Sequence, residues 1–377
     1  LGRKKTVFWV GVLFFVSALG CSFAPEPYSF SLFRFIGGIG VGVSSVAAPI
    51  YISEITTGSN RGKLGGLYLF WLVFGILMAF ISYWALKGVD GDKEWRSMQG
   101  IEAIPDLLYT LKLLRIPYSP RRMVSQHKDS ETALEVLNSI YSQEEAKRQI
   151  QDIKASLSDS TINESLFQKK YSKILWLGFL IAFFNQLSGI NFVLYYAPEI
   201  LEQAGLGGKE SLFNSIAIGI VNLVFTIIGI RLLDKLGRRQ LLIIGSIGYI
   251  LSLVMVGICF QQQLQPIFTI IFICLFVASH AIGQGAVIWV FISEIFPTKV
   301  RAYGQSWGTG THWIFAALIT LVTPVFLDAD NGYIKDTVWY IYYFFAGMMV
   351  LQLFWALFKM PETKGISLEE LAKKLAK

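Results

Sequence analysis

Long apolar runs separated by short polar segments dominate the pattern of this sequence. Each run has about 20 mostly apolar residues, the length that an α-helix needs to cross roughly 30 Å of hydrocarbon. Because the backbone must pair with itself inside a bilayer, runs of this length are predicted to be helices. They lie near residues 7–24, 30–52, 66–86, 98–115, 174–197, 211–233, 240–260, 266–293, 306–327 and 337–359, and the fourth is interrupted by Glu102, Asp106 and Lys112. The pattern therefore predicts an all-α polytopic membrane protein.

The composition excludes an ordinary soluble enzyme. Of 377 residues, 54% are hydrophobic and only 16% are charged, whereas a soluble domain carries roughly a quarter charged residues. Cys21, Cys259 and Cys274 each lie inside an apolar run and are interpreted as small buried hydrophobes. Because the pattern contains no His/Cys cluster and no nucleophile–base pair, we predict that the protein is not an enzyme and holds no cofactor or metal.

Positive charges gather on alternate connections between the apolar runs. One set comprises Arg3 to Lys5, Arg61 with Lys63, the 116–172 stretch, Lys235 with Arg238 and Arg239, Lys299 with Arg301, and the lysines of the tail. The other connections hold only Lys87, Lys93, Lys209 and Lys335. The positive-inside rule predicts that the first set and both chain ends are cytoplasmic, in a multi-pass protein of the cell (inner or plasma) membrane. The net charge of +7 therefore reflects topology, and no nucleic-acid partner is expected.

A single long polar stretch, 116–172, divides the chain. Its patterning is helical at 131–137 and again at 144–148, which predicts a small helical linker on the cytoplasmic side. The expected organisation is an N-terminal transmembrane bundle of four spans at 1–115, the linker at 116–172, a C-terminal bundle of six spans at 173–359, and a cytoplasmic tail at 360–377.

Four markers recur in the same order in the two halves. Ile52-Ser-Glu-Ile55 returns 240 positions later as Ile292-Ser-Glu-Ile295, and Glu54 and Glu294 each stand seven residues before an arginine, Arg61 and Arg301. Gly2-Arg-Lys returns as Gly237-Arg-Arg, and Pro117-Tyr-Ser-Pro-Arg121 is matched by Pro361-Glu-Thr-Lys364. This order indicates a duplicated bundle. Two spans precede Gly237 but almost nothing precedes Gly2, so we expect two further N-terminal spans, and a twelve-helix protein of which ten spans are found in this chain.

These markers resemble the sugar porter family of the major facilitator superfamily. The resemblance covers essentially the whole chain and rests on an ordered set of motifs. They are Gly2-Arg-Lys, Arg34-Phe-Ile-Gly-Gly-Ile-Gly-Val-Gly42, Pro49-Ile-Tyr-Ile-Ser-Glu54, Trp95-Arg96, Pro117-Tyr-Ser-Pro-Arg121, Gln186-Leu-Ser-Gly-Ile-Asn191, Tyr195-Tyr196, Asp234-Lys-Leu-Gly-Arg-Arg239, Glu294-Ile-Phe-Pro297, Arg301 and Pro361-Glu-Thr-Lys-Gly365.

The resemblance implies two pseudo-symmetric helical bundles that carry a monosaccharide or related polyol by alternating access. Transport by proton symport and by facilitated diffusion both occur in such proteins, so a proton is a second expected partner beside the sugar and the lipid bilayer. Three alternatives stay open: an inactive truncated remnant, a sugar-binding transporter-like sensor, and a porter of non-sugar solutes. The sequence leaves the sugar and the oligomeric state open.

The span at 174–197 carries three amides around a natural helix break. Asn185, Gln186 and Asn191 flank Ser188-Gly189, and amides both donate to and accept from sugar hydroxyls. Gln186 and Asn191 are five residues apart, so they share a face only if the helix unwinds at Gly189. The alternative is that these amides are interhelical hydrogen-bonding groups.

The resemblance also implies a set of sugar-binding positions: Asn185, Gln186, Asn191, Asn222, Trp289, His312 and Trp313. Two of these positions depart from the family pattern, since Asn185 stands where many relatives have Gln and His312 replaces the usual Asn or Gln. A third departure lies outside the set, where Leu69 stands in place of an expected amide. Ala286 replaces a proline beside the expected gating bend near Trp289. His312 is interpreted either as a neutral hydrogen-bonding imidazole or as a proton-linked switch.

Charged residues are expected to act in two further places. Arg34 lies inside an apolar span, where it is either half of a proton-coupling switch or a structural hydrogen-bond donor. A repeated set at the cytoplasmic ends is expected to form a gate that latches the bundles shut: Arg3, Glu54, Arg61 and Arg121 in the first half, and Arg238, Arg239, Glu294 and Arg301 in the second. Tyr118 replaces the usual glutamate of its motif, so a weaker first-half latch is expected. The alternative is that all of these charges only set topology.

Overall fold

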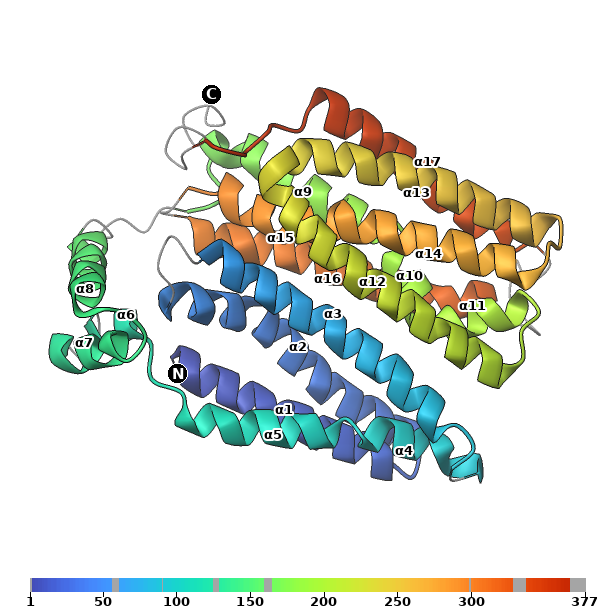
Figure 1. The fold of residues 1–377 in the computed structure, drawn as a ribbon, viewed down its shortest axis with the longest axis horizontal. Coiled ribbons are helices and arrows are strands. Elements are labelled where there is room, and N and C mark those ends of the chain that lie inside the picture. Colours follow the sequence, from blue (N-terminus) through green and yellow to red (C-terminus); the bar gives the residue numbers. More distant parts are fainter. Residues whose placement is uncertain are drawn as a thin grey trace. The chain divides into compact units, whose positions relative to one another are not determined.

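The computed structural model describes residues 2–55, 61–89, 91–124, 129–158, 165–297, 300–327 and 337–366. Among these residues all regular structure is helical (Figure 1). Nine helical segments of the described chain are long and apolar enough to cross a membrane. Each coincides with one of the predicted spans, because a run of this length and hydropathy has no stable alternative in a bilayer.

The predicted span at 98–115 is not a continuous helix. The chain forms α4 (Glu94–Gly100) and then α5 (Ala103–Arg115), with a turn at Ile101 and Glu102 between them. The charge-bearing positions Glu102 and Asp106 lie at this break, at the start of α5. This segment is not among the nine candidate spans of the described chain, so the prediction of one apolar helix there was wrong.

The chain divides into two compact units. The first comprises Leu1–Tyr68 and Ala85–Asn163, and the second comprises Leu69–Trp84 and Glu164–Lys377. The first unit contains α1 (Arg3–Phe23), α2 (Pro27–Ile55), both ends of α3 (Arg61–Leu86), the 3-10 turn η1 (Gly91–Lys93), α4 and α5. In it α1 packs against α2, α4 and α5. The small residues Gly37 and Gly40 let α2 approach Ser17 and Phe14 of α1 closely.

Helices α6 (Pro120–Arg122), α7 (Ser130–Asn138) and α8 (Gln143–Ser158) follow α5. Helices α7 and α8 cover the two stretches whose patterning predicted helices. The side chain of Asp129 caps α7 by accepting from the Thr132 N–H at 3.0 Å. A small apolar cluster that includes Ala133, Leu137 and Ala146 holds these helices together.

The second unit is built around α9 (Ser172–Gln186) and α10 (Ile190–Tyr195). The other elements of this unit are the turn η3 (Lys169–Tyr171), α11 (Ala197–Gln203), α12 (Gly208–Leu236), α13 (Arg238–Gln261), α14 (Pro266–Ile282), α15 (Gln284–Ile295), α16 (Arg301–Leu327) and α17 (Trp339–Phe358). In the most apolar window of Lys169–Tyr195, 72% of residues are buried, against 33% for α12 and 22% for α16. Helices α9 and α10 therefore lie at the centre of the unit, in contact with α14, α15, α16 and α17.

The chain bends between α14 and α15 at Gly283, where two other helices approach it closely. A Cβ on Gly245 of α13 would lie only 2.8 Å from the Gly283 Cα. A Cβ on Gly229 of α12 would lie 2.6 Å from the Ala281 carbonyl oxygen. Both glycines therefore permit main-chain contact with this bend, which forms in this chain with Ala286 in place of a proline.

Candidate functional site

The central helix of the second unit unwinds where the sequence predicted a break. Helix α9 ends at Gln186, and Gly189 adopts φ +83° before α10 begins. A Cβ at Gly189 would lie 2.6 Å from the Phe345 ring, so glycine meets both the torsional and the steric requirement. The Ser188 hydroxyl donates to the Asn185 carbonyl at 2.7 Å and accepts from the Ile190 N–H at 3.3 Å. These bonds satisfy main-chain groups that the break leaves without helical partners.

The break brings the three amides together. Asn191 Nδ2 donates to Gln186 Oε1 at 2.8 Å, and Gln186 Nε2 donates to Asn185 Oδ1 at 3.1 Å. Gln186 and Asn185 are buried, whereas Asn191 is partly exposed. Residues that a regular helix would place on different faces thus form one connected polar group.

Helices α15 and α16 add an imidazole and two indoles to these amides. Gln186 Nε2 lies 3.0 Å from Nδ1 and 3.1 Å from Nε2 of His312. The His312 ring centroid is 5.0 Å from that of Trp289 and 5.1 Å from that of Trp313, the latter edge-on at 86°. Amides that donate and accept, placed beside large aromatic faces, match the chemistry of a sugar, which has hydroxyls around a mildly apolar ring.

Asn222 is placed apart from this group. It is buried on α12, with 4% of its surface exposed. Among the residues that the structure describes, no hydrogen bond links it to the amides of α9 and α10. Its predicted role in binding stays a prediction.

A further polar residue, absent from the predicted set, lies next to the site. Gln284, the first residue of α15, is fully buried, and its Oε1 accepts from Asn185 Nδ2 at 3.5 Å. It stands beside the Gly283 bend in a largely apolar run. The only signal in the sequence was a single glutamine within a span, where an amide requires a partner.

In the first unit, Arg34 has an amide partner. Its side chain on α2 is exposed, and Nη1 donates to Gln99 Oε1 on α4 at 3.4 Å. A hydrogen-bonding role is thus present for Arg34. Its part in proton coupling stays a prediction.

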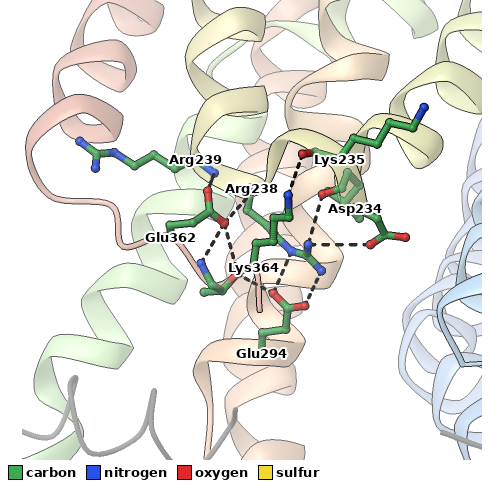
Figure 2. A network of polar contacts seen from close by, with 9 residues as sticks. Asp234, Lys235, Arg238, Arg239, Glu294, Glu362 and Lys364 are labelled. Atoms are coloured by element: carbon green, nitrogen blue, oxygen red, sulfur yellow. Dashed lines mark hydrogen bonds and ion pairs between the residues drawn. The ribbon is translucent and has the colours of Figure 1, made fainter. Parts of the chain in front are cut away.

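A network of charged groups ties together the end of the second unit at which α13 begins (Figure 2). Arg238 Nε and Nη2 donate to the two carboxylate oxygens of Glu294 on α15 at 3.0 and 2.6 Å. Arg238 is only 8% exposed, so this bidentate pair is largely shielded from water. Asp234 lies farther away, at 3.9 Å from Arg238 Nη1.

The segment after α17 completes this network. Glu362 accepts from the main-chain N–H groups of Arg238 and Arg239 at 2.9 and 3.0 Å, which caps the start of α13. Thr363 Oγ1 donates to Glu294 Oε2 at 2.6 Å. Burial alone would raise the pKa of Glu362, but hydrogen bonds from the N–H groups of Lys364, Arg238, Arg239 and Thr363 outweigh it and hold that pKa below its ordinary value of 4.5. Glu362 and Thr363 were not predicted as gate residues, since their motif indicated only the internal repeat.

Other predicted members of the gate are placed differently. Arg239 is directed to the end of α17, where Nε donates to the Ala356 carbonyl at 3.0 Å, and Figure 2 shows its side chain leading away from Glu294. Arg301 Nε donates to the Phe296 carbonyl at 3.3 Å. The side chains of Glu54 and Arg61 lie outside the described part of the structure.

At the matching corner of the first unit, the residue beside Gly2 is Arg122. A Cβ on Gly2 would overlap the Arg122 guanidinium, whereas the predicted Arg121 is exposed on α6. Lys4 Nζ lies 4.7 Å from the centre of the Tyr118 ring and donates to the Leu114 carbonyl at 3.2 Å. Arg3 begins α1 at this corner.

Comparison with known proteins gives consistent matches along the whole chain. The family described as "Sugar (and other) transporter" matches residues 1–375. The major myo-inositol transporter IolT of Bacillus subtilis (strain 168) is 33% identical, over 98% of this chain and 79% of that protein. The D-xylose-proton symporter of Escherichia coli (strain K12) is 31% identical, over 98% of this chain and 80% of that protein. The inward-open structure of the xylose transporter XylE from E. coli matches with a TM-score of 0.82 at 30% identity, covering 99% of this chain and 82% of that one.

Proposed function

The chain belongs to the sugar porter family of the major facilitator superfamily, and on that premise we propose that it moves a monosaccharide or a related polyol across a membrane. Its relatives are transporters rather than enzymes, and the nine apolar helices of the described chain make it a multi-pass membrane protein. This function accounts for the polar group at the α9–α10 break better than a sensor or an inactive remnant does, because its amides and aromatic rings form a preorganised set.

The observation that carries the proposal is the contact of Gln186 with His312 beside Trp289. In our proposal Gln186, Asn191 and His312 exchange hydrogen bonds with sugar hydroxyls, while Trp289 and Trp313 present aromatic faces to the apolar side of the ring. Asn185 supports Gln186, and Asn222 contributes from α12.

We further propose that the Arg238–Glu294 pair acts as a gate. The pair holds the beginning of α13 to the end of α15, and Glu362 and Thr363 fasten the segment after α17 to the same place. Opening this end of the second unit requires these contacts to separate, as alternating access demands. A latch between the two bundles, a cytoplasmic location of this end and of both chain ends, and coupling of a proton through Arg34 are further parts of this proposal.

Two preceding spans also remain a prediction, and it rests on the internal repeat. The bundle boundaries at 1–115, 116–172, 173–359 and 360–377 are proposed on the same ground. A porter for non-sugar solutes is the second candidate function, and the absence of charged groups from the contacts around Gln186 in the described residues favours the sugar.

Uptake of labelled D-glucose, D-xylose and myo-inositol into proteoliposomes tests the proposal. We expect uptake of at least one of these by the chain, or by the chain extended with two family-like N-terminal spans. Gln186→Ala should lower that uptake at least about tenfold, the effect of a lost buried hydrogen bond. Ser252→Ala is the matched control, since Ser252 is equally buried but donates only to main-chain carbonyls of its own helix. No uptake of any of the three by either chain would overturn the assignment to these sugars.

A further inference from the structure

A line of buried polar side chains continues from the site toward α13. Gln284 Nε2 donates to Gln352 Oε1 on α17. Gln352 Nε2 in turn donates to the Ser246 hydroxyl on α13 at 2.8 Å. All three side chains are fully buried, each with 0% of its surface exposed. None of the three belongs to the predicted binding set, and no hydrogen bond among the described residues joins Ser246 or Gln352 directly to Gln186.

The far end of this line has only one possible hydrogen-bonding direction. The Ser246 hydroxyl donates its single hydrogen to the Leu242 carbonyl at 2.7 Å. A hydroxyl that has used its hydrogen can only accept from other neighbours. Gln352 must therefore direct its NH2 group, and not its carbonyl, toward Ser246.

This direction passes from one amide to the next. Because the NH2 group of Gln352 is directed at Ser246, its carbonyl oxygen faces Gln284. Gln284 must therefore donate to that oxygen from its own NH2 group. Gln284 then offers its oxygen to Asn185 Nδ2, and Asn185 offers its oxygen to Gln186 Nε2. The final step is Asn191 Nδ2 donating to Gln186 Oε1.

Turning a single amide around would break the line on both sides. It would place two carbonyl oxygens against each other on one side and two NH2 groups on the other. In a fully buried place no water relieves such a mismatch, and each unmet polar group costs about 1–3 kcal/mol. The amides can consequently reverse only together, and Ser246 opposes that reversal.

We propose that Ser246, Gln352 and Gln284 are positioning residues that fix which way the amides of the sugar site point. The site then offers Gln186 hydrogens toward His312, and it leaves Asn191 Oδ1 as the acceptor at the end of the line. A sugar hydroxyl bound at Asn191 Oδ1 must therefore donate. This inference rests on the proposed function and adds to it the rule by which the site selects hydroxyl groups.

Analogues of the transported sugar test whether one of its hydroxyl groups must act as a donor. A fluorine in place of a hydroxyl accepts weakly but never donates, and a deoxy position does neither. We would measure uptake competition by the monofluoro and monodeoxy forms at each ring position. In the unaltered protein one position should lose affinity about tenfold, equally for both forms, because both lack the donor.

Gln284→Leu disconnects the site from its anchor. Asn185, Gln186 and Asn191 are then free to reverse, and a reversed Asn191 presents an N–H that fluorine can accept. At the identified position the fluoro form should gain about threefold or more over the deoxy form, while the KM of the parent sugar changes little. Ser246→Ala, which removes one atom without touching the site, should shift the same ratio in the same direction by a smaller factor.

Ser252→Ala is the matched control on the same helix, and it should leave the fluoro-to-deoxy ratio unchanged. Thermal unfolding of the two serine variants in detergent separates a loss of packing from a change of direction. If Gln284→Leu fails to fold, Ser246→Ala alone decides. Transport by the unaltered chain with no position where both analogues fail equally, or with an unchanged ratio in both variants, would overturn this inference. Absence of transport and of competition altogether would instead overturn the proposed function.

Discussion

The corner where α13 begins and the corner where α1 begins share a backbone conformation, but Tyr118 stands in the first unit where Glu362 stands in the second. Gly237 has φ +90° and ψ 170°, and Gly2 has φ +88° and ψ 148°. Two residues later, Arg239 donates to a carbonyl at the end of α17, and Lys4 donates to one at the end of α5. The internal repeat is thus visible in torsion angles and in the capping of a helix C-terminus by a basic side chain.

The difference lies in the residue that faces each helix start. In the second unit, the Glu362 carboxylate accepts from the first two N–H groups of α13. In the first unit, the matching residue is Tyr118, whose ring lies beside Lys4, and a guanidinium from Arg122 covers Gly2. A carboxylate favours a helix N-terminus whereas a cation does not. Duplication has therefore kept the geometry of the corner, while the favourable electrostatics are found at α13.

The largest effect is expected from breaking the Arg238–Glu294 pair of the second corner. Among the described contacts, the first corner shows no such pair. Arg238→Met should lower the free energy of unfolding by about 3–4 kcal/mol, because it leaves the partly buried Glu294 carboxylate without its cation. Thermal unfolding in detergent measures this loss. Replacing both partners, as Arg238→Met with Glu294→Leu, should recover most of it. A double variant as unstable as the single one would contradict this account.

Alanine at the two glycines compares how firmly each corner is held. Both substitutions force a positive φ on a side chain, and the expected cost is about 1–2 kcal/mol for Gly2→Ala and about 2–3 kcal/mol for Gly237→Ala. The second is larger because the new Cβ would lie 2.6 Å from Glu362 Oε2. That carboxylate is held in place by four N–H groups, three on Oε1 and one on Oε2, whereas the Arg122 side chain can swing aside. Equal losses in unfolding temperature would show that the caps are equally fixed.

Removing the negative charge from the second corner should have a smaller effect. Glu362→Gln is expected to cost about 1–2 kcal/mol, since an amide can satisfy fewer of the N–H groups. Because the pKa of Glu362 is held below its ordinary value of 4.5, its stabilising contribution is complete above that pH and is lost as the pH falls below it. The stability difference between the original and the variant should shrink over that acidic range. A difference that is constant with pH would assign it to packing.

The smallest effect is expected from giving position 118 in the first corner the carboxylate that position 362 carries in the second. Tyr118→Glu places a carboxylate near Lys4, Arg122 and the start of α1, and it should raise stability by about 0.5 kcal/mol at low salt. Tyr118→Gln is the control for the loss of the ring. If added salt does not remove the gain, the gain is not electrostatic.

Most of the fold could be predicted because hydropathy and run length leave an apolar segment one structure in a bilayer. The nine observed spans of the described chain all meet this criterion. The exception, at 98–115, carries charges at Glu102 and Asp106, and there the balance between one helix and two depends on packing against α1. The charges mark the run as interrupted, but packing of that kind has no sequence period, so the pattern could not tell one helix from two.

The candidate site could be predicted only in part. The convergence of Gln186 and Asn191 followed from Gly189, because a glycine after a polar turn marks a break in a helix. Gln284 and Gln352 could not be found in this way, since each is a lone amide in an apolar run, and its partner is on another helix. Similarly, the pattern gave no reason to choose Arg122 over Arg121, since two successive residues differ only in the side of the chain to which they point.

The contact between Gly245 and Gly283 lets the motion of α15 depend on other residues than the choice of substrate does. Main chain meets main chain there, with no side chain between them. We expect this contact to act as a hinge, about which α15 rotates through changes in main-chain torsion angles alone, without a change of side-chain rotamer on α13. Substitutions at Trp289 or Gln284 can then change the site without changing the contact at this hinge. Related transporters with this fold can therefore differ in the sugar that they bind while they keep the same hinge.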